Sequence, residues 1–303
     1  MKLRKSLVIT SISILLLLIT SFSLAAADRG YTHPEYLISV EELSENMDNE
    51  NLVIIDVRNT AKYLLGHLPG SVQMWGDDFA NPDGWVPGLA ATPEQFTATA
   101  QAKGVNNDSE IVVYDDASGL WASRLWFVFR YYGHDDVRLL EGGYGAWTDA
   151  GHDIRRLPRS VDQGNFTISE VRNDWIVDTD TVAENLDNPD FVVLDTRSEA
   201  EYLGEDTNPG ADRMGRVPGS VHVEWTQHLN EDNTFKTAAE IRELYAEHGI
   251  TEDLDVIASL CHTAVRAAHS YLALEMVGYE NVKVYDESWV GWANREDLPL
   301  ETN

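Results

Sequence analysis

The sequence predicts an α/β protein made of two copies of one domain, each with a parallel sheet flanked by helices. Its 303 residues suit two domains at roughly 100–200 residues each. Segments of the first half recur in the same order in the second half, and each half alternates short apolar runs with stretches of helical spacing. We expect a first domain over residues 28–158, a linker over 159–174 and a second domain over 175–303.

The evidence for a duplication is four pairs of similar segments. They are Leu52–Arg58 with Phe191–Arg197, Gly66–Val72 with Gly215–Val221, Gly133–Val137 with Gly278–Val282, and Gly143–Trp147 with Ser288–Trp292. The offset between the copies is 139 residues at the first pair, 149 at the second and 145 at the last two. Insertions between the copies are therefore small, and both copies should have the same fold.

The N-terminal residues 1–27 predict an export signal that is absent from the mature protein. Three positive charges precede a long apolar run, and Ala25–Ala27 supplies the small residues of a cleavage site. The alternative is an uncleaved membrane anchor, because about 18 apolar residues are near the minimum for spanning a bilayer. We expect a periplasmic or secreted protein that, once the signal is cleaved, has no membrane association.

Short apolar runs predict strands buried on both faces of a parallel sheet. They are Leu52–Ile55, Ile111–Tyr114, Phe191–Leu194 and Val256–Leu260. Ser39 and Thr92 predict helix starts, because Glu or Gln follows each of them three residues later and Pro93 suits the first helical position. Helical spacing of apolar residues from Leu120 and from Val265 predicts a helix after the second strand of each copy.

The charge balance excludes one large class of partners. The chain has 51 acidic and 22 basic residues, a formal net charge of −29 that is spread along its length. Nucleic-acid binding is excluded, because each phosphate contact would need a Lys or Arg. The scattered His residues show no metal-ligand spacing, so we expect no metal site.

Cys261 is the single cysteine, and its neighbours predict a reactive thiolate. It directly follows the strand Val256–Leu260 and directly precedes a predicted helix, which places it at the carboxyl edge of a parallel sheet, where α/β proteins bind ligands. Backbone N–H groups at a helix N-terminus favour thiolate over thiol, and Arg266 adds a positive charge five residues on. The alternative is an inert buried cysteine.

Taken together, these motifs resemble the tandem-domain rhodaneses, the thiosulfate and 3-mercaptopyruvate sulfurtransferases. The resemblance covers about Tyr36 to Glu301 and rests on both Asp-x-Arg strands, both Gly-x-x-Pro-Gly-Ser-Val turns, the Trp-containing motifs and the Cys-x4-Arg loop. It implies two similar α/β domains with only the C-terminal one catalytic. Aligning the copies places Asp116 opposite Cys261 and Trp121 opposite Arg266, so the first domain is expected to be inactive.

The resemblance also implies a double displacement without metal or organic cofactor. Cys261 would take sulfur from a small anionic donor as a persulfide and pass it to cyanide, sulfite or a thiol. Arg266 would stabilise the anion, Thr263 would offer a hydroxyl, and His262 would bind the donor or simply be solvated. The residues expected to bind substrate, partly through backbone N–H groups, are His262, Thr263, Ala264, Val265, Arg213 and Arg216.

Two departures from the family pattern bear on the donor. Related enzymes place an Arg just before the Tyr-Leu-Gly of the second domain, where this chain has Glu201, whose carboxylate would repel anionic donors. Arg213, Arg216 or Arg197 could replace that Arg, although an Asp-x-Arg residue is more often a structural ion-pair partner. Ala264 stands where Gly is common and narrows the backbone angles open to the loop. The identity of the sulfur donor therefore stays open.

Two rival functions remain. A Cys loop ending in Arg also occurs in phosphatases of the cell-cycle type, but their loops hold five residues between Cys and Arg, against four here. An arsenate reductase would need a second cysteine. A non-catalytic sulfur- or partner-binding module is the other alternative. The internal duplication favours a monomer, because the two copies can bury their faces on each other.

Overall fold

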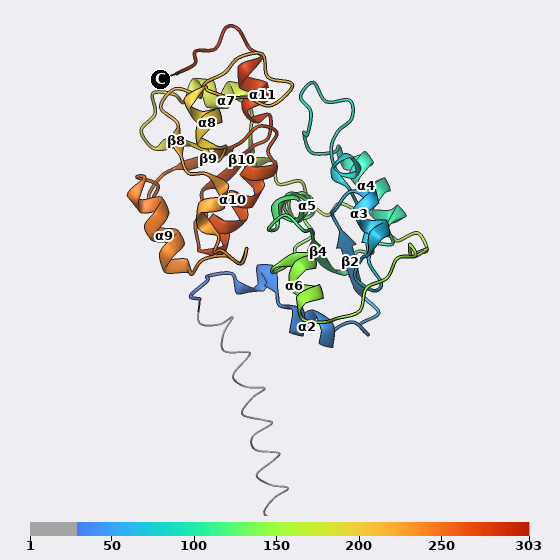
Figure 1. The fold of residues 1–303 in the computed structure, drawn as a ribbon. Helices are drawn as coiled ribbons and strands as arrows, with labels where there is room; N and C mark the ends of the chain where they lie inside the picture. Colours follow the sequence, from blue (N-terminus) through green and yellow to red (C-terminus); the bar gives the residue numbers. More distant parts are fainter. Residues whose placement is uncertain (1–28, 303) are drawn as a thin grey trace, which may run out of the picture.

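The computed structural model describes residues 29–302, so the predicted export signal lies outside the described residues. Figure 1 shows two domains side by side, with the first half of the chain in one and the second half in the other. Between residues 29 and 302, no helix is both long and apolar enough to cross a membrane.

The first domain is a five-stranded parallel sheet with strand order β1-β5-β4-β2-β3. Its strands are β1 (Leu37–Ile38), β2 (Leu52–Asp56), β3 (Val72–Gln73), β4 (Glu110–Tyr114) and β5 (Val137–Leu140). Its helices are η1 (Pro34–Tyr36), α2 (Val40–Glu45), α3 (Thr60–Leu65), η2 (Gly76–Asp78), α4 (Pro93–Ala102), α5 (Leu120–Tyr131) and α6 (Gly143–Asp149).

The second domain repeats this topology, with strand order β6-β10-β9-β7-β8, again all parallel. Its strands are β6 (Ile176–Val177), β7 (Phe191–Asp195), β8 (Val221–His222), β9 (Val256–Leu260) and β10 (Val282–Tyr285). Its helices are η3 (Asn173–Trp175), α7 (Thr179–Glu184), α8 (Glu199–Leu203), η4 (Trp225–His228), α9 (Ala238–Glu247), α10 (Val265–Met276) and α11 (Ser288–Ala293). The predicted fold class is confirmed.

The predicted helix starts are confirmed by their caps. The Ser39 side chain accepts a hydrogen bond from the Glu42 N–H at the start of α2. Thr92 and Gln95 form a reciprocal capping box at the start of α4, with Pro93 as its first residue. The four predicted strands correspond to β2, β4, β7 and β9.

The segment predicted as a linker is packed against the first domain. Phe166 is buried against the rings of Phe96 and Phe129. The Gly164 N–H donates to the Gln101 carbonyl, and a Cβ at position 164 would lie 1.9 Å from the Val105 carbonyl oxygen. Only glycine fits this close approach, so the linker's path is fixed by the first domain.

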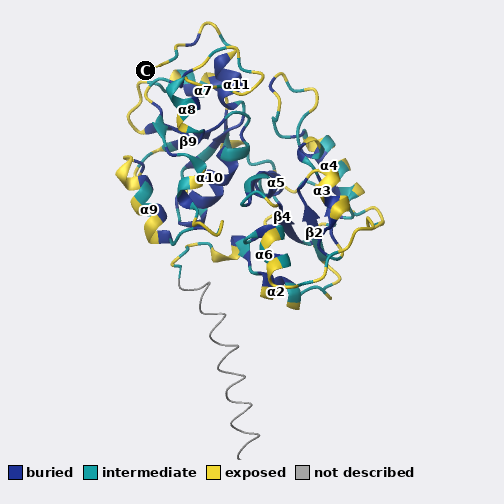
Figure 2. Cartoon of the chain, in the orientation of Figure 1, coloured by how far each residue is buried: buried dark blue, intermediate teal, exposed yellow. Residues whose placement is uncertain are grey.

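The two domains are held together mainly by α5 and α10, the helices that follow β4 and β9. One buried hydrophobic cluster continues from the first domain into the second through these helices. Within it, Phe127 and Tyr271 meet edge to face with ring centroids 5.0 Å apart, and Trp126 is fully buried beside them. In Figure 2, α5 and α10 lie next to each other where the two domains meet. The helix behind the cysteine is thereby supported by its counterpart.

Candidate active site

Cys261 lies where the sequence predicts it, in the turn between β9 and α10. Its side chain is almost entirely buried, at 1% exposure. The turn ends at Ala264, which adopts a left-handed conformation with φ of 61° before the helix begins at Val265. A non-glycine residue rarely takes this conformation, so the surrounding contacts must hold the loop in place.

Ser288, at the start of α11, provides those contacts. Its hydroxyl oxygen accepts hydrogen bonds from the backbone N–H groups of Cys261 at 3.2 Å and Ala264 at 3.0 Å, and donates to the Tyr285 carbonyl at 2.8 Å. Ser288 is itself left-handed, with φ of 51°. The Ala264 N–H, predicted to contact the substrate, is therefore already used to fix the loop.

Strand pairing identifies the residue of the first domain that is equivalent to Cys261. The last residues of β4 and β9 pair with the same position of the neighbouring strand, the Asp of each Asp-x-Arg motif. The next residue is Asp115 in the first domain and Cys261 in the second, so the predicted counterpart Asp116 is corrected to Asp115. The first loop, residues 115–119, is one residue longer than the second, 261–264, and counting back from the helix therefore reaches Asp116.

The Asp115 carboxylate fills the centre of its own loop. It is buried and accepts hydrogen bonds of 2.8 to 3.1 Å from four backbone N–H groups. The donors are Ala117, Gly119, Trp121 and Ala122. The loop between β4 and α5 is therefore an anion-binding turn, and the Asp115 carboxylate is the anion that it binds.

The corresponding turn of the second domain has open donors. The starts of α5 and α10 make Arg266 and Ala267 the counterparts of Trp121 and Ala122. Within residues 29–302, no acceptor reaches the backbone N–H groups of Arg266 and Ala267. These N–H groups are thus available to a sulfur anion on Cys261, in the place where the first domain puts a carboxylate.

Arg266 is held by Glu201, a partner that the sequence analysis missed. The two guanidinium nitrogens of Arg266 donate to the two Glu201 oxygens at 2.6 and 2.9 Å. Burial would raise the pKa of Glu201, but the hydrogen bonds and charge of Arg266, with help from Ser198, lower it to about 2. Burial lowers the pKa of Arg266, and Glu201 and Cys261 more than offset this, so the guanidinium stays charged.

The sequence pattern of the rhodanese-like domain matches this chain twice, at residues 39–150 and 178–295. The chain belongs to the rhodanese family. It is 33% identical to the sulfur carrier protein TtuD of Thermus thermophilus, over 89% of this chain and 98% of that one. It is 30% identical to the thiosulfate sulfurtransferase of Corynebacterium glutamicum, over 90% of this chain and 92% of the relative. The protein is a sulfurtransferase with two tandem rhodanese-like domains.

Solved structures agree with this fold. The structure of EanB in complex with ergothioneine matches with a TM-score of 0.80 and 28% identity, covering 89% of this chain and 71% of that one. A structure of EanB with a cysteine persulfide, also with ergothioneine, matches with a TM-score of 0.78 and 27% identity, covering 90% of this chain and 72% of that one. A protein of similar fold thus carries sulfur on a cysteine.

The remaining loop residues lie beside Cys261. The His262 Nε2 hydrogen-bonds to the Pro209 carbonyl at 3.0 Å, while its buried Nδ1 has no partner among the described residues. Burial lowers the pKa of His262, so its ring is neutral at pH 7. Thr263 packs against Gly88 of the first domain, where a Cβ would lie 2.9 Å from the Thr263 Cβ. Val265 is half-buried at the helix start.

Arg213, predicted to contact the donor, has its guanidinium engaged by the protein backbone. Its guanidinium donates to four backbone carbonyls, those of Trp292, Ala293, Arg295 and Leu298, and so ties α11 to the C-terminal segment. A side chain of this kind looks like any surface Arg in the sequence, because carbonyl acceptors leave no sequence signal.

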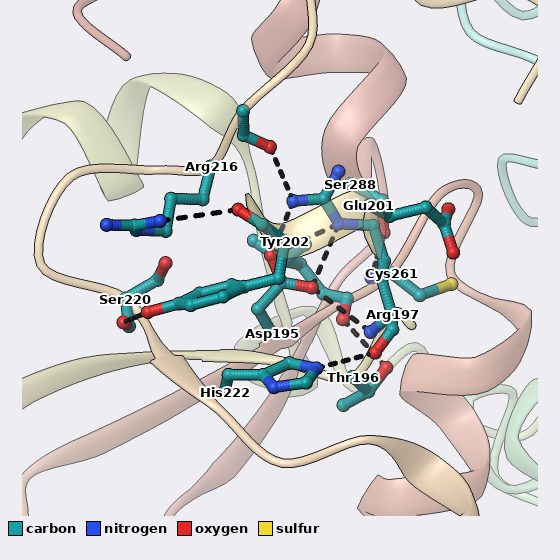
Figure 3. A network of polar contacts seen from close by, with 12 residues as sticks. Asp195, Thr196, Arg197, Glu201, Tyr202, Arg216, Ser220, His222, Cys261 and Ser288 are labelled. Atoms are coloured by element: carbon teal, nitrogen blue, oxygen red, sulfur yellow. Dashed lines mark hydrogen bonds and ion pairs between the residues drawn. The ribbon is translucent and has the colours of Figure 1, made fainter. Parts of the chain in front are cut away.

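Arg216 and Arg197 also have structural partners. Arg216 pairs with Glu301 at 2.5 Å and stacks on the Tyr202 ring, and in Figure 3 it lies across Tyr202 from Cys261. Arg197 forms a buried ion pair with Asp195 at 2.6 Å, as the sequence analysis anticipated for an Asp-x-Arg residue. Across residues 29–302, no cluster of His, Cys, Asp or Glu is arranged to hold a metal ion.

Proposed function

We propose that this rhodanese moves a sulfane sulfur from a small donor of the thiosulfate or 3-mercaptopyruvate type to a thiophilic acceptor such as cyanide, sulfite or a thiol. The single observation that carries the proposal is the open anion-binding turn around Cys261, whose counterpart in the first domain is filled by Asp115. The tandem-domain sulfurtransferases among the relatives support the same reaction class.

The first half-reaction forms a disulfur bond on Cys261. Its thiolate attacks the outer sulfur of thiosulfate, the bond between the two thiosulfate sulfurs breaks, and sulfite leaves with the electron pair. With 3-mercaptopyruvate the carbon–sulfur bond breaks instead, its electron pair goes to carbon, and the resulting pyruvate enolate takes up a proton to leave as pyruvate. The N–H groups of Arg266 and Ala267 hold the resulting persulfide anion.

The second half-reaction restores the thiolate. A lone pair of the acceptor attacks the outer sulfur, a new bond to that sulfur forms, and the bond to Cys261 Sγ breaks with its electron pair returning to Sγ. No electron donor or acceptor from outside is needed, because sulfane sulfur is transferred at one oxidation level. Burial of Cys261 keeps water and oxidants away from the persulfide between the two steps.

Intact mass of the purified protein tests this proposal. Incubation with each donor should add about one sulfur atom, cyanide should remove it as thiocyanate, and the Cys261→Ser variant should show neither change. A protein that takes up sulfur but never releases it to cyanide, sulfite or thiols would instead be a sulfur-binding module. Absence of any sulfur uptake, with a thiol that does not alkylate in the folded state, would contradict the enzymatic proposal.

We further propose that the mature protein is exported and monomeric. The apolar run before Ala25–Ala27 supports export, and the burial of α5 against α10 within one chain supports a monomer. N-terminal sequencing of the protein from a secreting host tests the first point: a mature start near Asp28 is expected, and an intact Met1 would favour the membrane-anchored alternative. Light scattering coupled to size-exclusion chromatography tests the second.

A further inference from the structure

We propose that His262 is the proton acceptor that activates thiols in the second half-reaction, so that thiols protonated at neutral pH are the acceptors this site favours. The inference rests on the proposed sulfur transfer through Cys261 and deepens it by naming the class of acceptor. Its basis is one ring nitrogen of His262, which carries no proton, is shielded from solvent and belongs to the residue next to the nucleophile.

The hydrogen bond to Pro209 decides which nitrogen of His262 carries the proton. A backbone carbonyl only accepts hydrogen bonds, so the Nε2 that lies 3.0 Å from the Pro209 oxygen must be the N–H donor. In the neutral ring the other nitrogen, Nδ1, then has a lone pair and no proton. Nδ1 is therefore the atom of His262 that accepts a proton from a substrate.

This Nδ1 is buried and has no hydrogen-bond partner between residues 29 and 302. A buried polar atom without a partner costs free energy, and such an atom in a folded protein calls for an explanation. A polar hydrogen brought by a substrate would supply the missing partner, and the S–H group of a thiol is such a donor.

The segment that holds the ring also contacts the ion pair beside Cys261. The Pro209 carbonyl accepts from the ring, and the amide of the preceding residue, Asn208, donates to Glu201 at 2.7 Å. Glu201 in turn holds the guanidinium of Arg266, which interacts with the Cys261 side chain. These contacts form a circle that starts and ends at the cysteine loop, and the ring therefore lies on the side of the loop that carries the guanidinium.

His262 is in its neutral form at pH 7, as a base must be. Burial lowers its pKa more than the Pro209 hydrogen bond and the charge of Glu201 raise it. The other charged groups that act on the ring are Arg266 of α10 and Arg197 after β7, and both add to the lowering. The ring is therefore ready to accept a proton at and above a pH of about 6.5.

The step needs a base because a thiol attacks sulfur as its thiolate, and most thiols are protonated at neutral pH. The thiol S–H bond breaks as Nδ1 takes the proton, and the electron pair of the thiol sulfur forms the bond to the outer sulfur of the persulfide. The bond between that sulfur and Cys261 Sγ breaks, and its electron pair returns to Sγ. The proton then passes from Nδ1 to the new persulfide or to water, so no oxidant or reductant is consumed.

His262→Gln separates the base from the hydrogen bond to Pro209. A Gln amide still offers an N–H to the Pro209 carbonyl, but it does not accept a proton near neutral pH. His222 provides the matched control, because its Nε2 also donates to a backbone carbonyl, that of Arg197, at 2.8 Å. His222 is the last residue of β8, so His222→Gln makes the same exchange in the same domain but outside the cysteine loop.

Single-turnover discharge of the persulfide is the measurement. Cys261 is first loaded with sulfur from the donor that the intact-mass experiment identifies, and excess donor is removed. The persulfide is then discharged by 2-mercaptoethanol or by sulfite. Sulfite attacks through a sulfur lone pair that carries no proton, so its reaction needs no base and reports any general disturbance of the loop.

We expect His262→Gln to slow discharge by 2-mercaptoethanol about a hundredfold and to change discharge by sulfite by less than about threefold. His222→Gln should leave both rates within about twofold, because that ring has no part in the proton transfer.

The pH dependence gives a second readout, which a purely structural role of His262 would not change. With 2-mercaptoethanol, the unmodified protein should react at a nearly constant rate between pH values of about 7 and 8, where the base is neutral and the thiol is protonated. The rate of His262→Gln should rise about tenfold per pH unit over the same range, because this variant depends on free thiolate.

The failures of the two proposals are distinguishable. An unchanged thiol rate in His262→Gln, or equal losses with the thiol and with sulfite, would overturn the role of His262 and leave sulfur transfer intact. A thiol rate of the unmodified protein that rises about tenfold per pH unit would overturn it as well, without reliance on the folding of any variant. An unmodified protein that never takes up sulfur, or never passes it to an acceptor, overturns the proposed function itself.

Discussion

The two strand-to-helix turns of this protein share one backbone plan and differ in what fills it. In the first domain, Asp115 places a carboxylate on four N–H groups of its own turn. In the second domain, Cys261 stands at the equivalent position, and the N–H groups of Arg266 and Ala267 have no acceptor within residues 29–302. The comparison indicates how one turn serves two purposes. In the first domain the bound anion is a side chain of the protein, whereas in the second domain the anion to be bound is the sulfur anion that the reaction forms on Cys261.

The second turn also differs in how it is held. Gly143 in the first domain, with φ of 56°, is replaced by Ser288 in the second, with φ of 51°. A Cβ on Gly143 would lie 2.3 Å from the Asp115 carbonyl oxygen, whereas Ser288 uses its hydroxyl to bind the Cys261 turn. In the catalytic turn, two additional hydrogen bonds thus offset the backbone strain of Ser288.

The largest expected effect is that of removing the nucleophile. Cys261→Ser should lower sulfur-transfer turnover by about a thousandfold or more, because a hydroxyl does not form the persulfide. Its free energy of unfolding should change by no more than about 1 kcal/mol, since the exchange is nearly isosteric. Steady-state assays and urea denaturation measure both quantities. Residual turnover near the unmodified level would place the sulfur carrier outside the second turn.

Next in size is the loss of Arg266. Arg266→Gln should lower the free energy of unfolding by about 3–5 kcal/mol, because it leaves the buried Glu201 carboxylate without its charged partner. Adding Glu201→Gln to this variant should recover most of the loss, and urea denaturation of the single and double variants forms the double-mutant cycle. Equal stability of Arg266→Gln and the unmodified protein would mean that the pair does not persist in solution.

A smaller loss is expected when the first turn is emptied. Asp115→Ala should lower the free energy of unfolding by about 2–3 kcal/mol, since four buried N–H groups lose their acceptor. Sulfur transfer through Cys261 should stay within about twofold at temperatures where the protein is folded. Measuring turnover and denaturation together distinguishes the structural role of the first turn from the catalytic role of the second. A large loss of turnover without unfolding would assign the first turn a part in catalysis.

Ser288 provides a finer comparison. Ser288→Ala should cost about 1–2 kcal/mol of unfolding free energy and slow sulfur transfer, because the Cys261 and Ala264 N–H groups lose their acceptor while the strained backbone stays. Ser288→Gly, which copies the first domain, should cost less because glycine relieves the positive φ. Should the alanine variant prove the more stable of the two, the hydroxyl would not be what holds the turn.

The smallest effect concerns acid stability. Because the pKa of Glu201 is lowered to about 2 in the folded state, its contribution to stability is present above the unfolded pKa of about 4.5 and is lost as the pH falls toward 2. The difference in unfolding free energy between the unmodified protein and Glu201→Gln should therefore shrink from pH 5 to pH 3. A difference that stays constant over this range would contradict the ion pair.

Much of the fold could be predicted from the sequence because the signals are local or repeated. The apolar run before Cys261, the helix caps at Ser39 and Thr92, and the matched segments of the two halves all lie within short stretches. The position of the nucleophile at a strand end before a helix follows from the same signals.

The partners within the site could not be predicted in this way. The Glu201–Arg266 pair joins residues 65 positions apart, and the acceptors of Arg213 are backbone carbonyls that any sequence would supply. The first-domain residue equivalent to Cys261 is Asp115 and not Asp116, because the two turns differ in length by one residue. Only the register of the paired strands identifies the equivalent residue. Long-range pairing and loop length thus determine what local patterns leave open.

The central claim is that the second turn holds the sulfur anion where the first turn holds its own carboxylate. A crystal structure of the protein loaded with sulfur on Cys261 tests it most directly. The outer sulfur should lie at hydrogen-bond distance from the backbone N–H groups of Arg266 and Ala267, superimposing on the Asp115 carboxylate when the two turns are aligned. An outer sulfur that points away from these N–H groups, with the turn still intact, would contradict the account.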